Sequence, residues 1–321
     1  MKRSMTNKSA WEETLAQSPT ILMEGALGER LKREWGLRID GPAAMAPLAD
    51  DPKGREGLVR LWSEYAAIAQ RYKLPFWATT PTRRANQERM HRAGLDESLF
   101  HRHWALLNSV RQQVKTPMFI GGLMGCRGDA YTGEGCLEVE PAFKLHRWQA
   151  RALARAGVDF LYAGIMPTLP EALGMARAMA DTGLPYIISF TIRRTGTLVD
   201  GTPIDAAIGC IDRETQTPPA LYMTNCVHPA IAYEALAQPV NRTERIALRF
   251  KGIQANTSAL DYDRLDHSAD LQGAAPEALA HDMMRLKRDM GLTVLGGCCG
   301  TDGRHMEAIA RAATARDREK A

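Results

Sequence analysis

The chain has 321 residues, of which 45% are hydrophobic and 24% are charged, as in soluble proteins with a sizeable core. Its 41 basic and 37 acidic residues leave a net charge of +4, too even a balance to indicate nucleic acid or an anionic membrane as partner. No run reaches the ~20 apolar residues that span a bilayer, and residues 1–13 lack the apolar stretch of a signal peptide. We therefore expect a cytoplasmic protein without nucleic-acid or membrane partners.

Short apolar runs rich in β-formers alternate with amphipathic helical patterns along the chain. The predicted strands are 20–23, 76–80, 118–122, 160–165, 186–191, 221–226, 246–254 and 293–298. The predicted helices are 58–72, 99–114, 143–156, 172–182, 230–237, 276–290 and 302–316. Eight strands, each followed by a helix or a long excursion, predict a single (β/α)8 TIM barrel, which usually takes ~250 residues. A doubly wound open sheet would show the same alternation and stays open as an alternative.

No internal repeat, low-complexity segment or Gly/Ser linker divides the sequence. We expect one domain over residues 1–321, with residues 1–18 as a polar N-terminal extension. In such barrels the chemistry sits at the carboxyl ends of the strands. The polar residues that end the predicted strands are Glu24, Thr79, Thr80, Asn225, Cys226, Asn256, Cys298 and Cys299.

Three of the six cysteines fall at the ends of predicted strands six and eight. Adjacent cysteines on a regular strand point to opposite faces, but Gly296, Gly297 and Gly300 around Cys298 and Cys299 could turn both sulfurs toward one point. Cys226 would add a third thiolate. Three thiolates with an open fourth position are typical of a catalytic zinc site, and sulfur ligands favour zinc over magnesium or calcium.

Other interpretations of these cysteines remain open. They could be buried apolar side chains, a vicinal disulfide or a redox dithiol. His228 could add a fourth ligand, although a histidine before Pro229 at a helix start is more often a cap. Cys126, Cys136 and Cys210 have no partner in the sequence, and we interpret them as packing or loop positions.

The segment 296–302, GGCCGTD, and the segment Asn225-Cys226 followed by Pro229 resemble motifs of the homocysteine S-methyltransferase family. The likeness extends from about Ile21 to Ala310. It includes MEGALGERL at 23–31, where the family usually has Asp in place of Glu24, and the threonines around Thr80. It also includes GDAYTG at 128–133, HRWQARALARAGVD at 146–159, DGT at 200–202 and Asn256.

The resemblance implies a zinc-dependent (β/α)8 enzyme that moves a methyl group to a thiol such as homocysteine and so produces methionine. It implies Cys226, Cys298 and Cys299 as ligands of Zn²⁺. Glu24, Gly25, Thr80, Asn225 and Asn256 would contact substrate. The implied partners are small molecules, namely a thiol acceptor and a methyl donor.

One position departs from the family pattern. The family usually carries Phe-Glu-Thr at the end of strand four, where the glutamate holds the amino group of homocysteine, but Gly164 stands at that position here. Losing a buried carboxylate that pairs with an ammonium costs on the order of 2–5 kcal/mol. Either another acid such as Glu24 takes over, or the acceptor is a different thiol. Arg193 and Arg194 could meet an anionic group, although a solvated loop also explains them.

The expected mechanism is attack of a zinc-activated thiolate on the methyl carbon of a sulfonium donor such as S-methylmethionine or S-adenosylmethionine, or of a betaine. A free thiol has a pKa of about 8.5, which zinc coordination lowers. No second domain for a cobalamin or folate and no G-x-G-x-x-G motif are evident. Two alternatives remain: a zinc-dependent demethylase or methyltransferase acting on a non-homocysteine thiol, and an inactive ligand-binding barrel.

Overall fold

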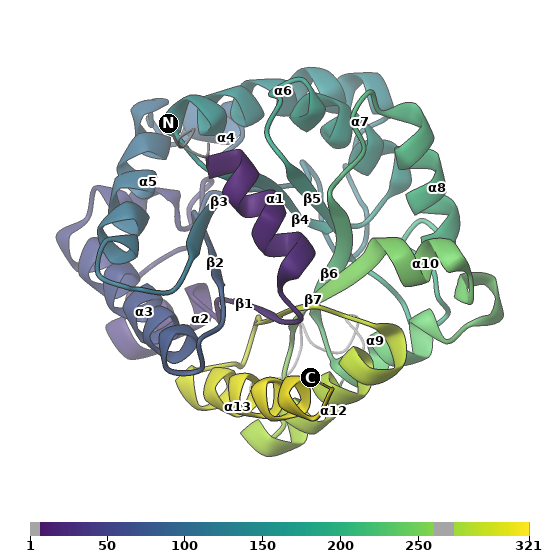
Figure 1. Ribbon diagram of the computed structural model, residues 1–321. Helices are drawn as coiled ribbons and strands as arrows, with labels where there is room; N and C mark the ends of the chain where they lie inside the picture. The colour runs from purple at the N-terminus through teal and green to yellow at the C-terminus, as the bar shows by residue number, and fades with distance from the viewer. Residues whose placement is uncertain (1–6, 260–272, 321) are drawn as a thin grey trace, which may run out of the picture.

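Eight parallel strands close into a barrel, in the order in which they occur along the chain (Figure 1). The computed structural model describes residues 7–259 and 273–320. The strands are β1 (Ile21–Met23), β2 (Phe76–Thr79), β3 (Met118–Gly125), β4 (Phe160–Met166), β5 (Tyr186–Phe190), β6 (Leu221–Val227), β7 (Phe250–Ala255) and β8 (Val294–Gly297). Ile21 of β1 pairs with Val294 of β8, which closes the ring. The predicted TIM barrel is confirmed, and the open sheet is excluded.

Helices surround the barrel on its outside (Figure 1). They are α2 (Gly28–Trp35), α3 (Pro52–Arg71), α4 (Gln87–Arg92), α5 (Ser98–Arg111), α6 (Val139–Ala156), α7 (Leu169–Ala180), α8 (Ile204–Glu214), α9 (Pro229–Leu236), α10 (Glu244–Arg249), α12 (Pro276–Met290) and α13 (Gly303–Lys320), with short 3-10 turns η1 (Ala46–Ala49) and η2 (Pro239–Asn241). Among the described residues, no helix combines the length and the apolar character that crossing a membrane requires.

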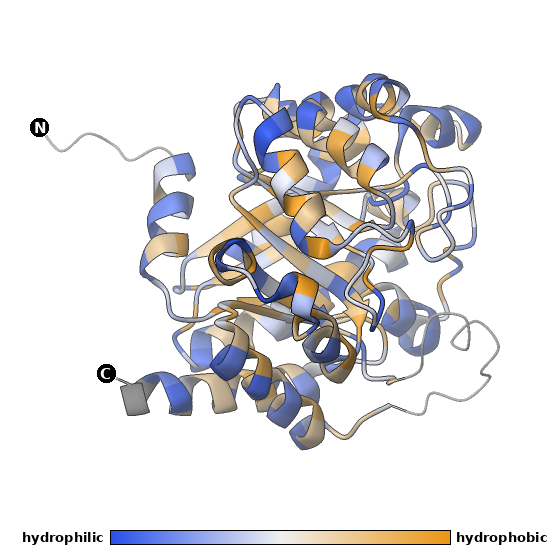
Figure 2. Ribbon diagram, turned by 90° about the vertical axis from the view of Figure 1, so that its right-hand side faces the viewer, coloured by the Kyte–Doolittle hydropathy of each residue, from blue (hydrophilic) through white to orange (hydrophobic). Residues whose placement is uncertain are grey.

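Helix α1 (Asn7–Gln17) lies across the end of the barrel where the strands begin (Figures 1 and 2). Its Trp11 is fully buried and stacks on Trp77, with ring centroids 5.0 Å apart. The Trp11 ring also lies 5.6 Å from that of Phe160, the first residue of β4. Buried aromatic side chains therefore fill this end of the barrel, and in such barrels the chemistry sits at the opposite end, where the strands finish.

The predicted strand 246–254 is wrong in its first part. Residues Glu244–Arg249 form helix α10, and the strand begins at Phe250. The Thr243 side chain accepts a hydrogen bond from the backbone N–H of Ile246 at 3.1 Å, which caps the helix start. The apolar residues of this segment suited a strand equally well, and the cap decided the local conformation. The other predicted strands match the observed ones to within three residues at each end.

Candidate metal centre

Three cysteine sulfurs meet at the carboxyl ends of two strands. Cys226 lies near the end of β6, and Cys298 and Cys299 follow β8 directly. Their Sγ atoms lie within 4.8 Å of one another, and those of Cys226 and Cys299 are 3.5 Å apart. The fold thus brings together the three thiols that the sequence singled out, in a group that could hold a metal ion.

An unusual backbone conformation places Cys226 in this group. Its φ is 62°, a value that residues other than glycine rarely adopt. The pairing of β6 with β7 shifts register between Asn225 and Val227, so the regular alternation of side chains is interrupted at this cysteine. Such strain costs on the order of 1–3 kcal/mol and clusters at functional sites.

The glycines around Cys298 and Cys299 act in two ways. Gly300 has a φ of 81° and supplies the turn that the sequence led us to expect. Gly296 and Gly297 do not adopt positive φ, and close packing requires them instead. A Cβ on Gly296 would lie 2.7 Å from the Cβ of Met23, and one on Gly297 would collide with the side chain of Thr301.

Two side chains donate hydrogen bonds to the Cys226 sulfur. The Tyr131 hydroxyl lies 3.5 Å from Sγ, and the Asn256 Nδ2 lies 3.7 Å from it. Hydrogen bonds from the Cys298 and Cys299 thiols hold the pKa of Cys226 well below its usual value. Conversely, the negative charge of a Cys226 thiolate raises the pKa of Tyr131 well above its ordinary value. Of the three thiols, Cys226 therefore ionises most readily.

A buried glutamate holds the loop that carries Tyr131. Glu171 of α7 is fully buried, and its two carboxylate oxygens accept the backbone N–H groups of Arg127 at 2.6 Å and Leu137 at 3.0 Å. Its Oε1 also lies 2.8 Å from the Nε2 of His146. The carboxylate thus ties together the two ends of the Tyr131 loop. Sequence patterns did not predict this role of Glu171, since Arg127 and Leu137 lie 44 and 34 residues from it in the chain.

Glu24 lies at the end of β1 with only 3% of its surface exposed. Its Oε2 accepts the Thr79 backbone N–H at 2.8 Å, and its Oε1 lies 2.5 Å from the Thr79 hydroxyl. Burial raises its pKa to about 8, although both Thr79 contacts oppose that change. The carboxyl group is therefore largely neutral at pH 7.

Two of the residues expected to contact substrate, Thr80 and Gly25, make contacts within the protein. The Thr80 Oγ1 lies 2.8 Å from that of Thr82 and accepts the Leu123 backbone N–H at 3.2 Å. Gly25 leaves space for Tyr65, because a Cβ there would lie 2.8 Å from the phenol oxygen. Hydrogen bonding within the protein therefore explains a threonine at position 80, and close packing against Tyr65 explains a glycine at position 25.

Asn225 links the ends of three strands. Its Oδ1 accepts the Ser189 hydroxyl of β5 at 2.6 Å and the Ile165 backbone N–H of β4 at 2.9 Å. Ile165 has a φ of 54°, which is rare for a β-branched residue. A Cβ on Gly164 would lie 3.8 Å from the Asn225 Nδ2. A side chain at position 164 would therefore lie close to Asn225, the residue that directly precedes Cys226.

Several side chains that the sequence left ambiguous have structural roles. The His228 Nδ1 accepts the Ala230 backbone N–H at 3.2 Å, which caps α9. Arg194 pairs with Glu234 at 2.9 Å. Cys126 is buried and its Sγ lies 3.5 Å from the Gly128 carbonyl oxygen.

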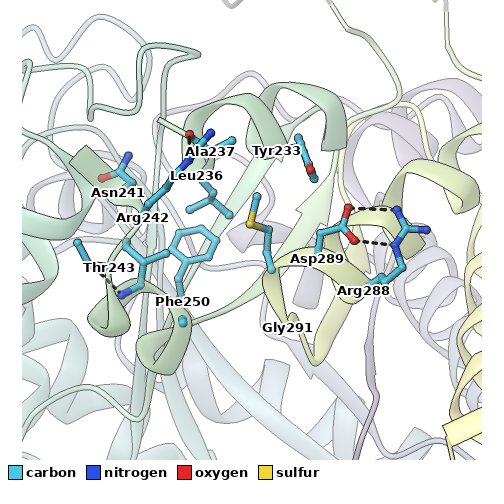
Figure 3. A pocket seen from close by; sticks show the side chains of 13 residues that line it. Tyr233, Leu236, Ala237, Asn241, Arg242, Thr243, Phe250, Arg288, Asp289 and Gly291 are labelled. Carbon is cyan, nitrogen blue, oxygen red and sulfur yellow. Dashed lines mark hydrogen bonds and ion pairs between the residues drawn. The ribbon is translucent and has the colours of Figure 1, made fainter. Parts of the chain in front are cut away.

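A separate cavity of about 610 Å³ lies outside the barrel, lined by residues of α9, α10 and the end of α12 (Figure 3). Phe250, the first residue of β7, lines it, and Arg288 and Asp289 form an ion pair at its edge with a shortest distance of 2.6 Å. The position of Phe250 at the start of β7 shows that this cavity lies toward the beginning of the strands. None of the predicted site residues lines this cavity.

Comparison with known proteins points to one family. The family model described as homocysteine S-methyltransferase matches residues 21–313. The chain is 23% identical over 307 residues to homocysteine S-methyltransferase YbgG of Bacillus subtilis, covering 91% of this chain and 94% of that protein. It is also 28% identical over 144 residues to methionine synthase of Mycobacterium leprae, covering 44% of this chain and 11% of that protein.

Solved structures show the same fold. The metallated form of the homocysteine methyltransferase MmuM from Escherichia coli superposes with a TM-score of 0.74 at 21% identity, covering 95% of this chain and 99% of that chain. The oxidized form of MmuM gives a TM-score of 0.73 at 20% identity, covering 95% and 97%. Since the family model extends over most of the barrel, this chain belongs to the homocysteine S-methyltransferase family and is a methyltransferase.

Proposed function

We propose that this protein is a zinc-dependent S-methyltransferase that moves a methyl group from a small sulfonium or betaine-type donor to a thiol. The observation that carries the proposal is the convergence of Cys226, Cys298 and Cys299, with Sγ atoms within 4.8 Å of one another, at the carboxyl ends of β6 and β8. Three thiolates suit a catalytic zinc ion with one position left for substrate. Free thiols also suit a reducing compartment, which favours the cytoplasm.

The surroundings of the cysteines fit such an ion. Tyr131 and Asn256 donate hydrogen bonds to the Cys226 sulfur, and donors of this kind orient ligands and tune a metal. Bound zinc would supply the Lewis acidity that keeps a thiol deprotonated near neutral pH. The described cluster holds no histidine or carboxylate ligand, which favours a soft thiophilic metal over magnesium or calcium.

In the proposed reaction the acceptor sulfur forms a bond to the donor's methyl carbon while the bond from that carbon to the donor's sulfur or nitrogen breaks. The donor leaves as a neutral thioether or amine, and the thiol proton passes to solvent. The protein's part is to bind and orient both molecules at the open end of the barrel, because α1 and its Trp11 close the other end.

Metal analysis tests the metal part of this proposal. The reduced wild-type protein should contain about one zinc ion per chain, and Cys298→Ser should lose most of it together with the activity. Cys210→Ser, on α8 and outside the cluster, is the matched control. Wild type without zinc, or full activity in Cys298→Ser, would show that the metal mechanism is wrong.

The acceptor is homocysteine in the simplest form of the proposal, giving methionine as product. Gly164 favours the alternative of a thiol that lacks an ammonium group, because the family's glutamate is absent there and Glu24 is largely neutral at pH 7. Homocysteine and 4-sulfanylbutanoate, which lacks only the amino group, form a matched pair of acceptors. A higher kcat/KM for homocysteine supports the amino-acid acceptor, and a higher value for 4-sulfanylbutanoate supports the alternative.

A further inference from the structure

A second cavity, of about 720 Å³, lies beside the loop that follows β2. Five cationic side chains line it, Lys32, Arg83, Arg84, Arg89 and Arg92, against a single carboxylate from Asp40. The chain as a whole is nearly balanced in charge, so this concentration of one sign is local. Asp40 already pairs with Lys32 at 3.0 Å.

The structure pairs none of the four arginines of the cavity with a carboxylate among the residues that it describes. Within the described ranges 7–259 and 273–320, no ion pair joins Arg83, Arg84, Arg89 or Arg92 to an acid; the nearby Glu88 pairs with Arg127 at 3.3 Å instead. Arg89 is half-buried and donates to the Arg127 carbonyl oxygen at 2.7 Å. Burial, followed by repulsion from Arg84, lowers the pKa of Arg89. Like charges held together without a counter-charge favour an anion between them.

The cavity belongs to the end of the barrel where the strands finish. Pro81, Arg83 and Arg84 come directly after β2, and the Arg83 side chain packs against Gly125, the last residue of β3. The apolar part of the lining, Ile39, Pro42 and Met45, comes from the segment between α2 and α3. A cavity lined by both guanidinium groups and apolar side chains suits a small organic molecule with acidic groups.

We propose that this cavity binds a small dianion, either a phosphorylated compound or a dicarboxylate. Arginine suits both groups because its planar fork donates two parallel hydrogen bonds to either one. The proposal does not depend on the cysteine cluster, and it is testable by binding alone.

Isothermal titration with inorganic phosphate and with succinate, at ionic strength held constant with sodium chloride, tests the site. We expect saturable binding of one ion per chain by the wild-type protein. The double variant R84A/R92A removes two exposed side chains and should bind about tenfold more weakly. Tighter binding of phosphate assigns the site to phosphorylated compounds, and tighter binding of succinate assigns it to dicarboxylates.

Two controls keep the test specific. Arg213→Ala removes an exposed positive charge from α8, outside the cavity, and should bind like the wild type. The double variant R84K/R92K keeps both charges but loses the fork geometry, so it should also bind more weakly than the wild type. The proposal is overturned if neither ion binds saturably, or if R84A/R92A binds as tightly as Arg213→Ala.

Discussion

Replacing Glu24 with glutamine tests whether the buried carboxyl group at the end of β1 is neutral. Folding raises the pKa of the Glu24 carboxyl group from 4.5 to about 8. Below pH 4.5 this group therefore carries its proton in both the folded and the unfolded chain. As the pH rises, the unfolded chain releases this proton first, and the free energy of unfolding falls until the pH passes the folded pKa. One pKa unit corresponds to about 1.4 kcal/mol. Ionisation of Glu24 therefore lowers the free energy of unfolding by about 5 kcal/mol in total, and about 3 kcal/mol of this decrease occurs between pH 5.5 and 8.5.

Glutamine imitates the protonated carboxyl group, since its oxygen can accept the Thr79 backbone N–H and its amide can donate to the Thr79 hydroxyl. The assay is urea unfolding of wild type and Glu24→Gln from pH 5.5 to 8.5. We expect the stability of the variant to rise relative to wild type by about 3 kcal/mol over this range. Glu56→Gln, an exposed position on α3, is the charge-matched control. A constant difference between Glu24→Gln and wild type would refute the reasoning.

The remaining predictions concern the site and the closed end of the barrel. Tyr131→Phe removes the hydroxyl that donates to Cys226 and should weaken metal affinity by about 10–100-fold in chelator competition, whereas an unchanged affinity contradicts the role of this contact. Glu171→Ala frees both ends of the Tyr131 loop; we expect faster hydrogen exchange there, and exchange like that of wild type would contradict it. Trp11→Ala should lower the free energy of unfolding by about 3–5 kcal/mol with kcat unchanged below the melting temperature, and a smaller loss would mean that α1 hardly stabilises the barrel. If an acceptor's ammonium binds at Glu24, homocysteine should release more protons at pH 7 than 4-sulfanylbutanoate, because both acceptors lose the thiol proton but only homocysteine would ionise Glu24. The binding enthalpy of homocysteine should then depend more strongly on the buffer, and equal dependence for the two acceptors would exclude that pairing.

Much of the architecture could be predicted from the sequence, because strands that are buried on both faces must be apolar throughout. Segments such as Tyr186–Phe190 and Phe160–Met166 are apolar or small at nearly every position, and all of their residues are buried. The positions of the cysteines at the ends of β6 and β8 were likewise predictable, since every parallel strand of a barrel finishes at the same end. The helix α10 before Phe250 was not predicted from the sequence, because its formation depends on the side-chain cap from Thr243.

The sequence by itself determined the alternation of strands and helices and the three thiols that the barrel brings together. Only the tertiary structure decided what surrounds them. The Tyr131 hydroxyl reaches a sulfur 95 residues away in the chain, Glu171 ties together both ends of that loop, and Trp11 stacks on Trp77 across the closed end of the barrel. The pKa of Glu24 and the gathering of four arginines in the cavity beside β2 are also tertiary properties. Burial and charge depend on which distant side chains become neighbours, and local sequence patterns do not record those neighbours.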